Sequence, residues 1–211
     1  MPVPADLARS FTISLPAWVE EELADVPAVL ATRQDRMALV HRLAGRNFRE
    51  GDGGPFAAVV VDTDSGELVS VGVNVVLSTG ISSGHAEVTA LGLAQVGTGS
   101  WDLGAGGARR ELVVNWRPCA QCYGATLWSG VRTLVVAGSG PELEEITGFD
   151  EGPVREDWAE QFQARGIDVV TDVLREEALE VYRAYATHVA ATGAVVYNAR
   201  ADTGGDTGSD G

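Results

Sequence analysis

Two short segments that lie far apart in the sequence constrain the fold of this chain more than any other feature. They read His85-Ala86-Glu87 and Pro118-Cys119-Ala120-Gln121-Cys122, and the second contains both cysteines of the chain. Cysteines three residues apart can place both sulfurs on one side of a first helical turn, where free N–H groups and the helix dipole favour thiolates. Thiolates together with a neutral imidazole suit zinc. If His85, Cys119 and Cys122 hold one ion, the fold must bring the two segments together.

The number of ligands indicates the kind of metal site. A structural zinc site generally has four protein ligands, whereas a catalytic site has three and keeps a fourth position for water. The two motifs offer three ligands, which predicts a catalytic site. A Cys-x-x-Cys pair alone could instead be a redox pair or bind no metal, and a His-x-Glu triplet occurs by chance. Their joint occurrence, each at a predicted helix start, favours the metal interpretation.

Glu87 lies two residues after His85, which in a regular helix would put the two side chains about 200° apart. They converge only if His85 has non-helical backbone, so we predict a helix that begins at about residue 85. Ser82, Ser83 and Gly84 are suitable residues before such a start. A carboxylate beside zinc but not bound to it can take a proton from activated water and pass it on. Glu87 is therefore the candidate general acid and base.

Hydrophobic periodicity and turn residues predict alternating helices and strands. An amphipathic helix over 32–48 precedes two antiparallel strands over 56–61 and 67–76. Helices are expected over 84–96 and 118–128, with Pro118 at the first helical position of the second. Apolar strands are expected over 111–116 and 133–137, followed by a loop over 138–153. The last elements are a helical stripe over 154–162, a strand over 167–171 and a helix over 174–189. This order describes a mixed sheet covered by helices on both faces.

The length of 211 residues indicates one compact domain. We place it at residues 31–197, after an N-terminal extension over 1–30. Residues 198–211 are rich in Gly, Asp and Thr and carry no large apolar side chain, so we predict a disordered tail. His41 and His188 are interpreted as structural residues rather than ligands.

The charge balance restricts the class of substrate. The chain carries 15 basic and 30 acidic residues, which gives a formal net charge of -15 at pH 7 and repels nucleic-acid phosphates. We therefore expect a small-molecule substrate. The N-terminal residues lack the apolar core of a secretion signal, and no window reaches the about 20 apolar residues of a membrane span. A soluble, cytoplasmic protein is expected.

The two motifs resemble the signature of the cytidine deaminase-like superfamily of zinc deaminases, His-x-Glu followed by Pro-Cys-x-x-Cys. The resemblance covers about Thr32 to Tyr185. It implies an α/β fold, a three-layer αβα sandwich with a mixed five-stranded central sheet. It also implies one Zn2+ per chain, a homodimer, and Glu87 as the general acid and base.

Finer features are similar to the nucleobase branch of this superfamily, especially the guanine deaminases. The segment Gly53 to Val59 resembles the first strand of that branch, and Asn74 matches its base-binding asparagine. The segment Gly148 to Glu151 resembles a loop with a second proton-shuttling acid, here Asp150 or Glu151. The expected substrate contacts are Asn74, Phe56, Ala86 and Trp116.

The leading interpretation is hydrolytic deamination of a free nucleobase, with guanine to xanthine the first candidate. The chain departs from that branch at Asn115-Trp116-Arg117, where many relatives carry a threonine-containing stretch that ends in glutamate. A cytosine, triazine or nucleoside deaminase is therefore an alternative. The net charge argues against a tRNA adenosine deaminase. Retention of Glu87 argues against a non-catalytic zinc-containing binding protein.

Overall fold

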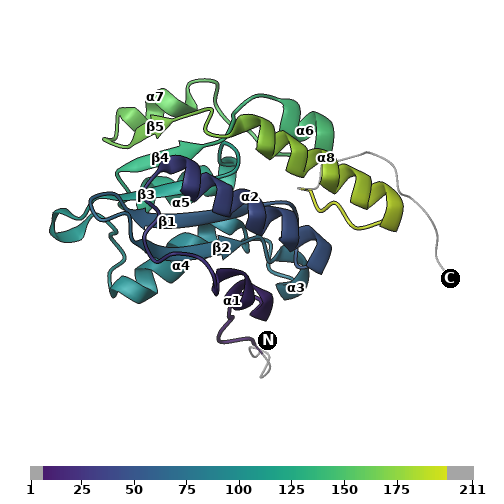
Figure 1. Ribbon diagram of the computed structural model, residues 1–211, viewed down its shortest axis with the longest axis horizontal. Helices are drawn as coiled ribbons and strands as arrows, with labels where there is room; N and C mark the ends of the chain where they lie inside the picture. The colour runs from purple at the N-terminus through teal and green to yellow at the C-terminus, as the bar shows by residue number, and fades with distance from the viewer. Residues whose placement is uncertain (1–6, 199–211) are drawn as a thin grey trace, which may run out of the picture.

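A computed structural model of the chain describes residues 7–198 and shows a sheet between two layers of helices (Figure 1). The strands are β1 (Ala57–Asp62), β2 (Leu68–Val73), β3 (Arg110–Val114), β4 (Thr133–Val136) and β5 (Asp168–Val170). They lie in the order β2-β1-β3-β4-β5. β1 is antiparallel to β2 and β3, whereas β3, β4 and β5 are parallel. The predicted three-layer sandwich with a mixed five-stranded sheet is confirmed.

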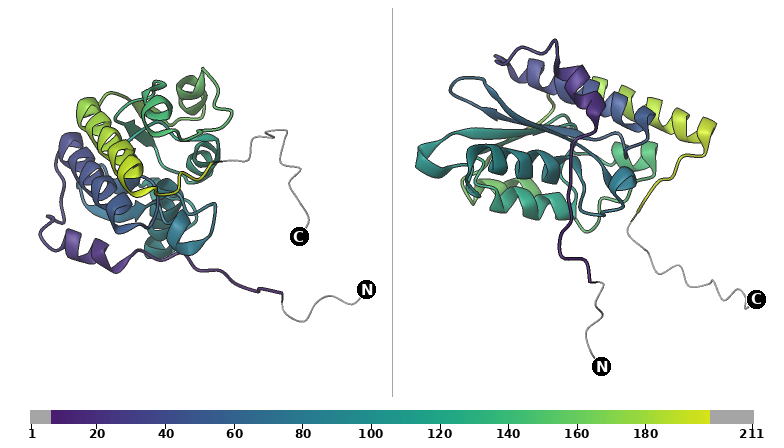
Figure 2. Two further views of the ribbon diagram at one scale, coloured as in Figure 1. Left: turned by 90° about the vertical axis from the view of Figure 1, so that its right-hand side faces the viewer. Right: turned by 90° about the horizontal axis from the view of Figure 1, so that it is seen from below.

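Each face of the sheet is covered by its own set of helices. One core cluster contains residues of α1 (Ala17–Leu23), α2 (Arg33–Glu50), α6 (Glu142–Thr147) and α8 (Arg175–Thr192). The opposite cluster contains residues of α4 (Ala86–Thr98), α5 (Ala120–Trp128) and α7 (Trp158–Gln163). Figure 2 shows α2 and α8 on one side of the sheet and α4 and α5 on the other. The short α3 (Val76–Thr79) and a 3-10 turn (Ala105–Gly107) lie in the connections.

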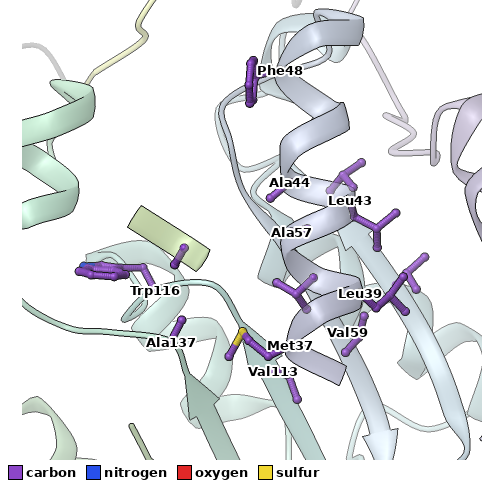
Figure 3. Packing of buried hydrophobic residues seen from close by; sticks show 14 of the residues in the cluster. Met37, Leu39, Leu43, Ala44, Phe48, Ala57, Val59, Val113, Trp116 and Ala137 are labelled. Atoms are coloured by element: carbon purple, nitrogen blue, oxygen red, sulfur yellow. The ribbon is translucent and has the colours of Figure 1, made fainter. Parts of the chain in front are cut away.

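The helix α2 illustrates how the sequence produces this packing. Thr32 and Asp35 form a capping box at its start, and Gly51 ends it with a left-handed φ of 87°. Its buried side chains lie against β1 and β3 (Figure 3). Each such apolar side chain stabilises the fold by about 1.5–3 kcal/mol relative to exposure. The labelled residues of α2 are Met37, Leu39, Leu43, Ala44 and Phe48.

The segments that contain the two motifs, 85–87 and 118–122, lie at the same end of the sheet. Because β1 is antiparallel to its neighbours, its start lies beside the ends of β2 and β3. The Asn115 side chain ties this end together: its Oδ1 accepts from the Ala57 amide at 3.2 Å and its Nδ2 donates to the Pro55 carbonyl at 2.8 Å. Gly72 lets α4 approach β2, since a Cβ there would lie 2.3 Å from the Ala86 carbonyl oxygen.

Two predicted strands end earlier than expected. β2 ends at Val73 and β3 at Val114, because the asparagines that follow use their side chains on neighbouring backbone instead of continuing the strands. The Oδ1 atom of Asn74 accepts from the Val76 amide at 3.2 Å. The strand β1 begins at Ala57, one residue after the predicted start at Phe56.

Helix boundaries also differ from the prediction. Pro118 is not the first helical residue of α5, because Cys119 has extended backbone and forms the N-cap. The helices α1 and α6 lie in segments that were predicted as an extension and a loop. Helices this short are not stable alone and depend on tertiary packing, here of buried Trp18 and Leu143.

The ends of the chain are described only in part. Residues 1–6 of the predicted extension and residues 199–211 of the predicted tail lie outside the described residues. Asn198, the first residue of that tail, donates to the Gly148 carbonyl and accepts from the Asp150 amide, each at 2.9 Å. Within residues 7–198, none of the helices combines the length and apolar character needed to cross a membrane.

We predict a pH-dependent stability from His41, which packs between α2 and the start of α8. The ring is 7% exposed, and its Nε2 donates to the Leu174 carbonyl at 3.0 Å. Burial lowers the pKa of His41 below its usual value of 6.5. The unfolded chain therefore binds this proton at a higher pH than the folded chain, so the free energy of unfolding decreases as pH falls below 6.5.

Urea denaturation of the wild type and His41→Gln at about pH 7.5 and about pH 5.5 tests this. We expect the variant to lose less stability over this interval than the wild type does. An equal loss in both proteins would show that His41 does not contribute to the pH dependence.

Candidate active site

His85 stands at the start of α4 with the backbone that the sequence analysis required. It is the N-cap, with an extended conformation (φ -72°, ψ 156°), and its carbonyl accepts from the Thr89 amide at 2.9 Å. The predicted helix start at about residue 85 is therefore confirmed. Glu87 lies in the first turn, and both side chains line one cavity.

The second motif is arranged in the same way at the start of α5. Cys119 is the N-cap and has extended backbone (φ -63°, ψ 172°), and its carbonyl accepts from the Tyr123 amide at 2.8 Å. Cys122 lies in the first turn and is fully buried. Two helix N-termini, each the positive end of a helix dipole, thus meet at the cavity.

The three predicted ligand atoms lie close together. The Nδ1 atom of His85 is 3.5 Å from the Sγ atom of Cys119 and 3.5 Å from that of Cys122, and all three atoms lie within 4.8 Å of one another. Tetrahedral zinc with bonds of about 2.3 Å to sulfur and about 2.0–2.1 Å to nitrogen separates a nitrogen from a sulfur ligand by about 3.5 Å and two sulfurs by about 3.8 Å. Both cysteines are free thiols. The donor set and its spacing therefore fit a zinc ion.

The surroundings of the two cysteines shift their pKa values in opposite directions, which favours one negatively charged sulfur at the site. The hydrogen bond from the Cys122 thiol lowers the pKa of Cys119 to about 4, and His85 contributes in the same direction. The same bond, together with burial, raises the pKa of Cys122 well above its usual value. Cys119 is therefore the more easily ionised of the two cysteines, and a zinc ion held by both sulfurs would displace the proton of Cys122.

Two buried carboxyl groups accompany the thiols. Glu87 is 6% exposed, and burial, followed by the charge of Cys119, raises its pKa to about 7. Burial, followed by the charges of Cys119 and Glu87, raises the pKa of Glu151 well above its usual range. A carboxyl with a pKa near neutrality can both accept and donate a proton. Asp150 differs: it is exposed, and its Oδ1 accepts from the Gly152 amide at 2.7 Å.

These groups lie in a cavity of about 390 Å³ whose walls are mostly apolar. Phe56 and Trp116 both contribute to the walls. The Phe56 ring meets the Phe149 ring edge-on at 5.1 Å. The Trp116 ring is 2% exposed, packs edge-on against Tyr182, and donates from Nε1 to the Gly140 carbonyl at 3.1 Å. Trp116 therefore forms a fixed wall.

Asn74 and Ala86 are placed differently from each other. Asn74 lines the cavity and is 1% exposed. Because its Oδ1 accepts from Val76, its side-chain NH2 group is the part that a ring in the cavity can meet. Ala86 is not among the lining residues, since its side chain packs in the core between α4 and the sheet.

The lining residues that were not proposed from the sequence include Arg117, Tyr197 and Asn198. Arg117 is the only Arg or Lys among the described lining residues, and its Nη2 lies 3.5 Å from Oε1 of Glu144. The signal that could have identified Arg117 from the sequence is its position directly before Pro118, where the second motif begins. Tyr197 and Asn198 reach the cavity from the end of the described chain. No local pattern in the sequence marks them, because only tertiary contacts bring them there.

Comparison with known proteins places the chain in a family. Residues 30–138 match the cytidine and deoxycytidylate deaminase zinc-binding region. This range covers more than half of the chain and includes both motifs. The chain therefore belongs to the cytidine and deoxycytidylate deaminase family, and the fold and the site together define a zinc-dependent deaminase.

Within that class, the chain is similar to guanine deaminases. The solved guanine deaminase from Nitrosomonas europaea is 42% identical, with a TM-score of 0.79, and the match covers 86% of this chain and 98% of that one. A variant of the NE0047 protein in complex with 8-azaguanine gives 42% identity, a TM-score of 0.80, and 86% and 98% coverage. Guanine deaminase of Bacillus subtilis (strain 168) is 32% identical over 109 residues, which are 52% of this chain and 65% of that relative. The chain thus spans less than two thirds of the length of this curated relative.

Removal of a ligand tests the metal site. We expect the purified protein to contain zinc and Cys119→Ala to lose most of it, because two remaining ligands bind zinc weakly. Metal content measured by plasma mass spectrometry checks this. Ser83→Ala, a substitution in the connection before α4, is the control and should keep its zinc. Equal zinc in both variants would contradict the ligand assignment.

Proposed function

We propose that this chain is a zinc-dependent guanine deaminase, which converts guanine and water to xanthine and ammonia. The observation that carries the proposal is the meeting of His85 with the two thiols, each at 3.5 Å, beside the buried Glu87 carboxyl. The similarity to the Nitrosomonas europaea guanine deaminase along 98% of that protein supports guanine as the substrate.

In this proposal His85, Cys119 and Cys122 hold one Zn2+ per chain. When bound, zinc lowers the pKa of coordinated water to about 7, so that water becomes a nucleophile at neutral pH. Glu87 accepts a proton from the attacking water and delivers it to the ring nitrogen N3. It then transfers the second proton to the amino group on C2, which leaves as ammonia while the oxygen stays on C2. The raised pKa of Glu87 suits a group that must take up and release protons in turn.

Glu151 is our candidate for the second proton-transferring acid. Burial raises the pKa of its carboxyl well above the usual range, which favours the protonated form that can donate a proton. Its backbone carbonyl accepts from the Ala120 amide at 2.9 Å, which holds the loop against the start of α5. Asp150 also lines the cavity, but it is exposed and its Oδ1 already accepts from the Gly152 amide, so it is the weaker candidate.

Substrate binding combines apolar walls with one directed polar group. Phe56 and Trp116 offer flat apolar surface for a planar ring. The NH2 group of Asn74 donates to an acceptor on the ring, and guanine presents both a carbonyl oxygen and ring nitrogens. Ala86 does not line the cavity and its side chain packs in the core, so it is the weakest of the expected substrate contacts.

We further propose a cytoplasmic homodimer, as the resemblance to the superfamily implies. A free base rather than a nucleic acid is the substrate, because the net charge of -15 opposes the binding of phosphates.

A panel of substrates tests the reaction. Ammonia release by the zinc-loaded protein is measured with guanine, adenine, cytosine, cytidine and a triazine. We expect guanine to give the highest kcat/KM. Higher activity on cytosine or the triazine would overturn the choice of substrate while leaving the deaminase class intact. No activity on any of them would overturn both.

Glu87→Gln tests the proton transfer. The amide keeps the size of the side chain but cannot carry the proton, so we expect kcat to fall by about 10²- to 10⁴-fold with zinc content and melting temperature retained. Glu145→Gln, an exposed residue of α6, is the matched control and should retain full activity. A fully active Glu87→Gln protein would refute this role.

A further inference from the structure

One wall of the cavity depends on Asp52, which does not itself line it. This wall consists of the loop over 51–56 and the segment over 74–84. It contributes Phe56, Asn74, Val76 and Ser82 to the lining. The backbone carbonyl of Asp52 accepts from the Leu77 amide at 3.0 Å and the Ser78 amide at 3.1 Å, so it joins the two segments.

These bonds satisfy the start of α3. The first amides of a helix have no partner within the helix and need acceptors elsewhere. The N-cap residue Val75 supplies no side-chain acceptor. Asn74 Oδ1 accepts from the Val76 amide, and Asp52 accepts from the next two amides. Asp52 therefore fixes α3, and α3 in turn fixes the Asn74 side chain.

The loop over 51–56 and the segment over 74–84 are also packed closely against each other and share hydrogen bonds, so that neither shifts without the other. A Cβ on Gly53 would lie 2.2 Å from Asn74 Oδ1 and 2.5 Å from the Asn74 carbonyl oxygen. The Nδ2 atom of Asn47 donates to the carbonyls of Gly54 and Asn74, at 2.9 and 2.8 Å. A displacement of the loop at Asp52 is therefore transmitted to Asn74.

Asp52 is held in turn by the helix α1. Its Oδ2 accepts from Trp18 Nε1 at 2.8 Å, and Trp18 is 7% exposed. The Arg46 guanidinium of α2 lies 5.1 Å from the centre of the Trp18 ring and pairs with Glu21 and Glu22 of α1. Figure 1 shows α1 and α3 toward the β2 edge of the sheet. α1 lies outside the range 30–138 that matches the family.

We propose that Trp18 and Asp52 are positioning residues for substrate binding. The helix α1 holds Asp52, Asp52 holds α3, and α3 keeps the oxygen of Asn74 turned away from the cavity so that its NH2 group faces the ring. The substrate side of this inference rests on the proposed function, whereas the hydrogen-bonded chain from Trp18 to α3 does not. Because neither residue touches Glu87 or the proposed zinc ligands, their loss affects binding rather than the chemical step.

The experiment compares Trp18→Phe, Asp52→Ala and Asp52→Asn in the full chain, with Glu20→Ala of α1 as the exposed control. We expect Trp18→Phe and Asp52→Ala to raise the KM for guanine and the Kd for 8-azaguanine about tenfold, near the lower end of the ratio for loss of a hydrogen bond to a charged group. We expect kcat to stay within about twofold and zinc content to be unchanged. Asp52→Asn keeps an acceptor oxygen for Trp18 and should restore most of the affinity, and Glu20→Ala should match the wild type.

Hydrogen exchange at the Leu77 and Ser78 amides supplies a readout that does not require activity. We expect faster exchange at these two amides in Trp18→Phe and Asp52→Ala than in Glu20→Ala. Unchanged exchange, an unchanged KM, or a lower kcat with loss of zinc would each overturn the positioning role. If the wild type neither deaminates guanine nor binds 8-azaguanine, the proposed function fails, and the exchange data alone decide whether α1 holds α3.

Discussion

The approach of two helix N-termini at one end of the sheet is the contact on which the site depends. His85 and Cys119 each stand outside their helix, with extended backbone, and this is what turns their side chains toward each other. A regular helix at either position would point one ligand away. The strand order makes the meeting possible, because α4 follows β2 and α5 follows β3 with only β1 between these strands. Burial of a carboxylate and of thiolates costs free energy, which a cation bound between them would offset.

The chemistry of the ligands explains why so much of this site could be predicted. One histidine and two cysteines can bind the same ion only if both helices start at the motifs. The motifs therefore predicted both where the two helices begin and which side chains come together. The order of the predicted helices and strands also correctly indicated a mixed sheet covered by helices on both faces. The ends of β2 and β3 could not be predicted, since they depend on where the asparagine side chains find backbone partners. The helices α1 and α6 and the lining residues Tyr197 and Asn198 depend on distant contacts that leave no local pattern.

The electrostatics of the cavity differ from those of the whole chain. The surface is acidic, yet the cavity holds its carboxyl groups in a largely apolar setting, which favours their neutral forms. Arg117 lines this cavity and lies 3.5 Å from the Glu144 carboxylate. Its positive charge acts against the rise in the pKa of Glu151. The three residues Asn115, Trp116 and Arg117 thus have two physical roles. Asn115 and Trp116 build the frame, whereas Arg117 alters the local potential.

The close contact at Gly72 limits how this protein can diverge. A side chain at this position would meet the Ala86 carbonyl at 2.3 Å and the Ala90 amide nitrogen at 2.4 Å, so α4 cannot be shifted without repacking the sheet. New ring shapes are therefore more readily accommodated by other lining residues, such as Phe149 after α6 and Tyr197 and Asn198 after α8. Changes in the shape of the cavity should therefore arise in these segments, while position 72 stays a glycine.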